Sequence, residues 1–309
     1  MSPRRTAVIA GASGYVGQHL RPALEADGIR VRTIGRSPGA DAQWGDDRSL
    51  TAVLDGVDLL VNLAGRSVSC RYSKRNADAI VASRTETTAT LGRALDRTDN
   101  SSTLWVNAST GTIYRDARDR PQDEATGELG TGFSVAVARA WENELFAAPT
   151  PVRKVALRMA IVLGSGGGAL NPFINLARIG FGGPMGSGEQ VFSWVHVDDV
   201  VRAILHLHAV PTIAGPVNVA APDPVTNAEL MAAVRAAFGW SHGLPLPAGF
   251  LELGARVIRT ETELVLKSRW VHPGVLLDSG FEFAHPALPQ ALDAIATQTP
   301  RGLLPVALG

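Results

Sequence analysis

The sequence predicts an α/β fold with a doubly wound parallel sheet and a smaller, partly helical C-terminal lobe. In the first half of the chain, short apolar runs alternate with stretches of helical spacing. Such strand–helix alternation gives a parallel sheet covered by helices on both faces. After residue 164, glycine-rich loops, short helical patterns and Pro-punctuated segments follow. This change indicates a second structural unit, and no internal repeat is visible.

The apolar runs place the strands, with one poorly defined strand near Trp44. The others are predicted at 6–12, 30–36, 57–65, 103–109 and 153–163. Helical spacing predicts helices from Val16 to about Leu24, over 76–95 and over 133–147. Pro22 lies inside the first helix and is expected to kink it or weaken a turn.

The second half gives weaker signals. A helix is expected to start near Asp198. The stretch 215–230 reads as strand, turn and helix, with Thr226 or Asn227 as N-cap and Glu229 in the first turn. The tail from about residue 245 is assigned to the smaller lobe.

Composition excludes several classes of protein. The 309 residues include 29 Lys+Arg and 29 Asp+Glu, so the net charge is zero and neither nucleic acid nor an anionic membrane surface is expected as partner. The single cysteine, Cys70, rules out a disulfide within the chain, which suits the cytoplasm. The N-terminal stretch lacks the features of a signal peptide, and no apolar run is long enough to predict a membrane span.

Three glycines follow the first strand in the spacing of a nucleotide-binding loop. In "IAGASGYVGQHL", Gly11 permits a tight turn, Gly14 lets backbone approach a pyrophosphate, and Gly17 allows close packing of helix on strand. Phosphates bind to the free N–H groups at such a helix N-terminus. The alternative is a glycine-rich turn without a ligand, in which the glycines carry an entropic cost and no benefit.

The end of the second strand indicates which dinucleotide binds. NAD enzymes usually place Asp or Glu there. This chain has Arg36 and Ser37, and no acid before Asp41. An arginine suits the 2′-phosphate of NADP, which it binds through paired hydrogen bonds. We therefore expect NADP (NADPH) as cofactor; the alternative is that Arg36 is a solvated surface residue.

Several motifs together carry a family resemblance. The segments "GASGYVG", "VNLAG", "NASTGTIY", "LRMAIVLG" and "WVHVDDV" arrive in the order seen in extended short-chain dehydrogenase/reductases, the epimerase/dehydratase group. More narrowly, "RYSKRNADAIVASRTETT", "GGGALNPF", "GSGEQVFSWVH" and "SRWVHPGVLLDSGFEFAHPALPQAL" resemble the atypical YfcH-like branch, which joins such a domain to a C-terminal domain of unknown function. The resemblance implies a Rossmann-type NADP-binding fold and little about substrate.

On this basis we expect two domains. Residues 1–164, with parts of 190–225 returning to them, form the NADP-binding domain, and 165–309 form the smaller substrate lobe. The cofactor is expected to contact Gly11, Ser13, Gly14, Tyr15, Val16, Gly17, Arg36, Ser37, Leu63, Ala64, Gly65 and Ala160.

The usual catalytic pair of the family is missing. Family enzymes carry Tyr-x-x-x-Lys on one helix, so that the phenol can exchange a proton with a substrate hydroxyl. No tyrosine of this chain is followed by lysine four residues later. Phe133 and Val137 stand in the matching positions, and neither can move a proton.

Two hydroxyl groups remain as catalytic candidates. Thr110 matches the family's Ser/Thr at the end of the fifth strand, and ligands bind beyond the carboxyl ends of parallel strands. Its alternative role is to satisfy loop backbone. Tyr114 is the tyrosine nearest this loop and a candidate substitute acid; alternatively it is a packed residue with a hydrogen-bonded tip.

A basic loop after "VNLAG" is expected to cover the nicotinamide. It holds Arg66, Cys70, Arg71, Tyr72 and Lys74, and binds an anionic substrate or is simply solvated. The YfcH-like branch often has Glu where Arg66 stands. The weaker substrate-binding candidates are Arg66, Tyr72, Phe133 and His196.

No metal is expected. His196, Asp198 and Asp199 suggest a metal site, but the resemblance explains them as a structural turn and a helix start, where acids are favoured by the helix dipole.

The leading hypothesis is an NADP-dependent oxidoreductase or epimerase-like enzyme acting by hydride transfer on a small carbonyl, alcohol or imine. The first alternative is a non-catalytic NADP-binding sensor or scaffold. The second is a cofactor held as a structural group or oxidised reversibly within one turnover, as in epimerases. Whether the chain forms a homodimer stays open.

Overall fold

A computed structural model describes residues 5–68, 70–100, 103–247, 249 and 266–306 of the chain. Its centre is a seven-stranded sheet whose order is β10-β6-β5-β4-β1-β2-β3, with every neighbouring pair parallel. The strands are β1 (Thr6–Ala10), β2 (Arg30–Gly35), β3 (Ala42–Gln43), β4 (Leu59–Asn62), β5 (Leu104–Thr110), β6 (Arg153–Met159) and β10 (Gly215–Val219). The predicted fold class, a doubly wound Rossmann-type sheet, is confirmed.

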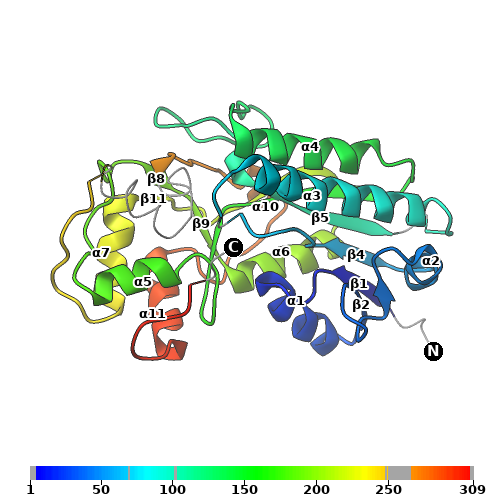
Figure 1. Ribbon diagram of the computed structural model, residues 1–309, viewed down its shortest axis with the longest axis horizontal. Helices are drawn as coiled ribbons and strands as arrows, with labels where there is room; N and C mark the ends of the chain where they lie inside the picture. The colour runs from blue at the N-terminus through cyan, green and yellow to red at the C-terminus, as the bar shows by residue number, and fades with distance from the viewer. Residues whose placement is uncertain (1–4, 69, 101–102, 248, 250–265, 307–309) are drawn as a thin grey trace.

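Helices cover both faces of this sheet (Figure 1). On one face lie α1 (Tyr15–Ala26), α6 (Val197–Ala209) and α10 (Gly274–Asp278); on the other lie α2 (Asp47–Leu54), α3 (Lys74–Leu95) and α4 (Phe133–Ala147). Side chains alternate along β1, so that Ala7 and Ile9 join the first core while Val8 and Ala10 join the second. This alternation is the reason that the strand is apolar throughout.

The smaller lobe has its own core. It contains α5 (Asn171–Arg178), α7 (Asn227–Ala237) and α11 (Leu288–Gln298), with the antiparallel pair β8 (Val191–Phe192) and β11 (Val225–Thr226). Thr226 is the N-cap of α7, and its capping box with Glu229 settles the choice between Thr226 and Asn227. The expected division at residue 164 stays a prediction, and residues 250–265 of the predicted tail lie outside the described residues.

One predicted strand is wrong. The run 153–163 is not continuous, because the Ala160 N–H donates to the Val219 carbonyl at 2.9 Å and the chain then leaves the sheet. The second part, β7 (Ile161–Leu163), pairs in parallel with β9 (Trp194–His196) instead. The chain thereby passes from the main sheet into the smaller lobe. Pro22, in contrast, lies inside α1, which runs unbroken over its full length.

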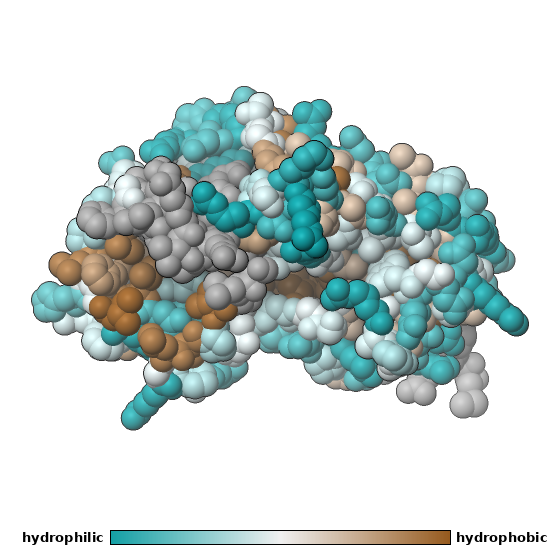
Figure 2. All heavy atoms as spheres, viewed as in Figure 1, coloured by the Kyte–Doolittle hydropathy of each residue, from teal (hydrophilic) through white to brown (hydrophobic). Residues whose placement is uncertain are grey.

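The surface differs between the two parts. Figure 2 shows apolar side chains gathering over the smaller lobe on this face. Its exposed apolar residues include Ile179, Phe181, Trp240 and Leu244. Among the described residues, no helix is long and apolar enough to cross a membrane.

Candidate functional site

The glycine loop lies where the strand order of the sheet reverses, between β1 and β4. Gly11 has φ +85°, and a Cβ there would lie 2.8 Å from the Leu63 carbonyl carbon. A Cβ on Gly17 would lie 2.7 Å from the Gly11 oxygen. Both glycines are therefore required by close packing, and Gly11 also by its backbone conformation. In open α/β sheets, this crevice is where ligands bind.

The N-terminus of α1 has the features of an anion site. Its N-cap is Gly14, which is exposed and contributes no side-chain hydrogen bond. The first helical residues, Tyr15, Val16 and Gly17, have N–H groups with no acceptor inside the helix. Ser13 is exposed beside them. These residues fit a dinucleotide pyrophosphate, which would meet backbone N–H groups and no side chain in between.

Tyr15 has a role that the sequence did not suggest. Its hydroxyl donates to the Ser165 carbonyl at 3.1 Å. Its ring fills the space that a side chain at Gly164, Gly167 or Gly168 would need, which accounts for the "GSGGG" segment. Burial, with a smaller effect of Asp198, raises the pKa of Tyr15 to about 12. The Tyr15 side chain thus clamps α1 to the loop that enters the smaller lobe.

The neighbouring cofactor candidates surround this crevice. Leu63 donates its N–H to Ala10 at 2.8 Å, and Ala64 donates to the Asn62 side chain at 3.1 Å, which turns the chain after β4. Gly65 is exposed at the end of that turn. Ala160 lies beyond the end of β6, between two hydrophobic clusters.

At the end of β2, Arg36 and Ser37 are exposed. The acid that follows, Asp41, is engaged by β2 itself: its carboxylate accepts from the Thr33 N–H at 2.8 Å and from the Thr33 hydroxyl at 3.0 Å. Arg36 is therefore the residue that a ligand would meet at this end of the strand.

Thr110 ends β5 and caps the short helix η1 (Gly111–Ile113). Its Oγ1 accepts from the Thr112 N–H at 3.1 Å, as in the second interpretation of this residue. A hydroxyl that accepts one bond still has its own proton to donate. Among the described residues, none accepts that proton, so Thr110 can serve both the backbone and a substrate oxygen.

Tyr114 is enclosed in the interior. It is 2% exposed, and its hydroxyl donates to Asn218 at 3.0 Å and accepts from Arg158 at 2.9 Å. Burial raises its pKa above the ordinary value despite those partners. A buried phenol with both hydrogen-bond partners inside the protein cannot reach a substrate, so the structure favours the packed interpretation of Tyr114 over its role as the acid.

Next to Tyr114 lies an ionic network that no local sequence pattern predicts. Arg158 binds Glu142 at 2.8 Å through Nε and 2.7 Å through Nη2, and the Ser109 hydroxyl donates to Glu142 at 2.6 Å. Burial works against the charge of Arg158, but the Glu142 carboxylate outweighs it and raises the arginine pKa. This network holds the side chain of Ser109, the residue before Thr110 on β5, in place.

His196 is also buried, and its contacts lie elsewhere. It is the N-cap of α6, where its Nδ1 accepts from the Asp198 N–H at 3.2 Å, and its ring stacks on His285 with 3.9 Å between centroids. Burial, helped by His285, lowers the His196 pKa to about 4. These contacts and this burial contradict the prediction that His196 contacts a substrate.

His196, Asp198 and His285 are the group in the described part of the chain whose ligand atoms lie close enough together for a metal ion. The Asp198 carboxylate is 3.4 Å from His196 Nδ1 and 3.6 Å from His285 Nε2. However, His196 Nδ1 is already the acceptor of the helix cap. We assign no ion to it, and the expected absence of metal stays a prediction.

Phe133 and Val137, which the resemblance places at the family's Tyr and Lys positions, belong to an apolar cluster. Val137, Cys70 and Ile80 are buried together, with Phe133 and Tyr72 packed against them. The Phe133 and Tyr72 rings lie 4.5 Å apart. Cys70 is thus an interior residue, while Arg66 is exposed and donates to Asn76 at 3.3 Å and, through its backbone N–H, to Ser83 at 3.0 Å.

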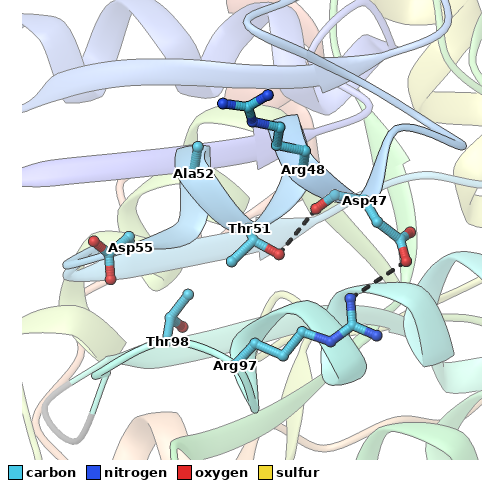
Figure 3. Close-up of a pocket in the computed structure, with 7 residues that line it drawn as sticks. All are labelled: Asp47, Arg48, Thr51, Ala52, Asp55, Arg97 and Thr98. Carbon is cyan, nitrogen blue, oxygen red and sulfur yellow. Dashed lines mark hydrogen bonds and ion pairs between the residues drawn. The ribbon is translucent and has the colours of Figure 1, made fainter.

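A separate hollow lies between α2 and the segment after α3 (Figure 3). It is lined by Asp47, Arg48, Thr51, Ala52, Asp55, Arg97 and Thr98. None of these is a predicted site residue. Two of them, Asp47 and Arg97, form an exposed ion pair of 3.3 Å across the hollow.

Solved structures agree with this architecture. The human epimerase family protein SDR39U1, solved with NADPH, superposes with a TM-score of 0.84 at 29% identity, covering 94% of this chain and 99% of that one. The UDP-N-acetylglucosamine 4-epimerase from Bacillus cereus superposes with a TM-score of 0.75 at 19% identity, covering 98% and 99%. The second likeness concerns the fold alone.

Relatives found by sequence are also described as epimerase family proteins. The chain is 31% identical over 292 residues to epimerase family protein SDR39U1 of Bos taurus, covering 93% of this chain and 98% of the relative. It is 32% identical over 299 residues to epimerase family protein Mb2239 of Mycobacterium bovis, covering 94% and 97%.

Family profiles cover both parts of the chain. One described as a domain of unknown function, DUF1731, matches residues 246–295, as the resemblance implied for the C-terminal part. The finer assignment to the YfcH-like branch stays a prediction. The profile of the NAD dependent epimerase/dehydratase family matches residues 7–220, more than half of the chain, and the chain therefore belongs to that family.

Proposed function

We propose that this protein is an NADP-dependent oxidoreductase or epimerase-like enzyme that acts on a small carbonyl, alcohol or imine. The observation that carries the proposal is the crevice at Gly11, Gly14 and Gly17, with Arg36 beyond the neighbouring strand and Asp41 turned back onto β2. The NADPH named with the human relative supports the same cofactor. When bound, the reduced nicotinamide supplies a hydride to an electrophilic carbon.

The protein's own residues bind the cofactor and orient the substrate. The N–H groups at the start of α1 hold the pyrophosphate, Arg36 holds the 2′-phosphate, and Thr110 donates a hydrogen bond to the substrate oxygen. The oxygen then needs a proton source, which Thr110 alone cannot be. The partner is a small molecule. The cytoplasm stays a prediction from the sequence, and a homodimer stays an open alternative.

The cofactor assignment is tested by Arg36→Ala. Charged hydrogen bonds contribute about 1.5–3 kcal/mol, so NADPH binding should weaken roughly 10- to 100-fold while NADH binding changes little. Arg30→Ala, an exposed residue at the other end of β2, is the matched control. Equal losses for both dinucleotides in Arg36→Ala would contradict the assignment.

Turnover is tested by NADPH consumption against a panel of carbonyls and imines. The apolar packing of Phe133 and Val137 favours a second candidate function, a non-catalytic NADP sensor or scaffold. Tight NADPH binding with no turnover in any substrate class would favour the sensor. Conversion of substrate without net NADPH consumption would favour reversible oxidation of an epimerase type.

A further inference from the structure

Elimination among the tyrosines leaves one phenol near the site. The chain has three tyrosines. Tyr15 is packed against the glycines of the 164–168 segment, and Tyr114 is sealed between Arg158 and Asn218. Tyr72 is only partly buried and lies on the loop that follows β4, at the carboxyl edge of the sheet. Tyr15 is partly buried as well, but its ring packs into the 164–168 segment and its hydroxyl donates to Ser165, so Tyr72 is the better placed tyrosine for a substrate at this edge.

Tyr72 stands beside the start of α4. Its ring contacts Phe133, the first residue of that helix, with 4.5 Å between centroids. The same helix packs against η1, which Thr110 caps. The loop carrying Tyr72, the start of α4 and the end of β5 thus converge on one edge of the sheet, where ligands of parallel sheets bind.

A partly buried cation accompanies this tyrosine. Arg84 of α3 stacks over Trp141 of α4 at 5.0 Å and lies against Gly65, whose Cβ would be 3.4 Å from the guanidinium carbon. Its Nη1 donates to the Ile80 carbonyl at 3.1 Å. No carboxylate in the described part of the chain forms an ion pair with it. Tyr72 packs against the buried cluster of Cys70, Ile80 and Val137, and Arg84 binds the carbonyl of Ile80 in that cluster, so both side chains lie beside the same cluster. Burial lowers the pKa of Arg84, and Tyr72 opposes that effect.

We propose that Tyr72 is the proton donor of this site and that Arg84 is a positioning residue that stabilises its phenolate. This assignment of Tyr72 and Arg84 rests on the proposed function, which supplies the hydride-transfer reaction. As the substrate carbon accepts a hydride from the reduced nicotinamide, the C=O bond becomes single and the Tyr72 O–H bond breaks. The proton goes to the substrate oxygen, Arg84 compensates the phenolate charge, and water returns a proton afterwards.

The other groups around Tyr72 favour the same assignment. Along α4, the facing positions are Phe133, Val137 and Trp141, which carry no charge. On the loop and α3, the charged and titratable groups are Arg66, Cys70, Arg71, Lys74, Arg75, Asp78, Arg84, Glu86 and Arg93. Two of these are acids: Asp78, which pairs with Lys74 at 2.9 Å on the exposed side, and Glu86, which is also exposed. The net charge near Tyr72 is thus positive, and it favours the phenolate.

The test is a spectroscopic titration of the tyrosines, which needs neither cofactor nor substrate. Phenolate absorbance near 295 nm is followed from neutral to alkaline pH in the wild type, Tyr72→Phe, Arg84→Met and Arg84→Lys. Because burial raises the pKa of both Tyr15 and Tyr114, Tyr72 should ionise first. This first phase should vanish in Tyr72→Phe. It should move up by about one pH unit or more in Arg84→Met, and return towards the wild-type position in Arg84→Lys.

Circular dichroism over the same pH range shows that each variant stays folded, and Arg84→Lys gives the answer if Arg84→Met does not fold. An early phase that persists in Tyr72→Phe, or that is the same with Arg, Met and Lys at position 84, would overturn the proposal. NADPH binding, measured on the same samples, tests the proposed function separately. A protein that does not bind NADPH would contradict the proposed function but would still give a tyrosine titration. A titration without the early Tyr72 phase would contradict the Tyr72 proposal even if NADPH binds.

Discussion

Replacing Arg158 by methionine tests the buried ionic network behind the site. Arg158 and Glu142 are 8% and 9% exposed in their side chains and are joined by two short hydrogen bonds. In Arg158→Met, the Glu142 carboxylate stays buried and keeps the Ser109 hydroxyl as donor. Removal of one partner from such a pair costs about 3–5 kcal/mol of folding free energy, because the other charge is left uncompensated.

The matched control is Arg97→Met, the same substitution in the Asp47–Arg97 pair of Figure 3. There the side chains are 54% and 68% exposed, and loss of the pair should cost less than about 1 kcal/mol. Both variants are compared with the wild type by urea unfolding at pH 7. Equal free-energy losses in the two variants would refute the view that burial makes the Glu142–Arg158 contact important.

Two other predictions concern His196 and Thr110. The pKa of His196 is about 4 in the native protein and 6.5 in the unfolded chain. The neutral, buried His196 therefore contributes fully to the free energy of unfolding above pH 6.5, and this contribution is lost as the pH falls towards 4. At pH 4.5 the loss should be roughly 2.5 kcal/mol in urea unfolding and should be reduced in His196→Gln; an identical pH dependence in both proteins would contradict it. Thr110→Val should abolish turnover while NADPH still binds, and Thr110→Ser, which keeps the hydroxyl, should retain activity; full activity in Thr110→Val would remove Thr110 from the mechanism.

The glycine loop and the sheet could be predicted because their signals are local. Gly11 and Gly17 are needed by the turn in which they lie, and the apolar runs of the strands follow directly from burial on both faces. The capping box at Thr226 is likewise a local signal, because it depends on four consecutive residues.

The choice between the alternative roles of Tyr114 and His196, and the packing of Arg84, could not be predicted in this way, because burial depends on segments far apart in the sequence. Tyr114 is sealed by Asn218, 104 residues later. His196 stacks on His285. Arg84 is placed by Gly65 and Trp141 on two other elements. A residue's type suggests its chemistry, but only the packing decides whether a ligand can reach it.

Equilibrium titration of the wild-type protein with NADPH and with NADH tests the central claim most directly. The crevice at Gly11, Gly14 and Gly17, with Arg36 exposed beside it, predicts that both dinucleotides bind and that NADPH binds at least about tenfold more tightly. Absence of binding by either dinucleotide, or a preference for NADH, would contradict it.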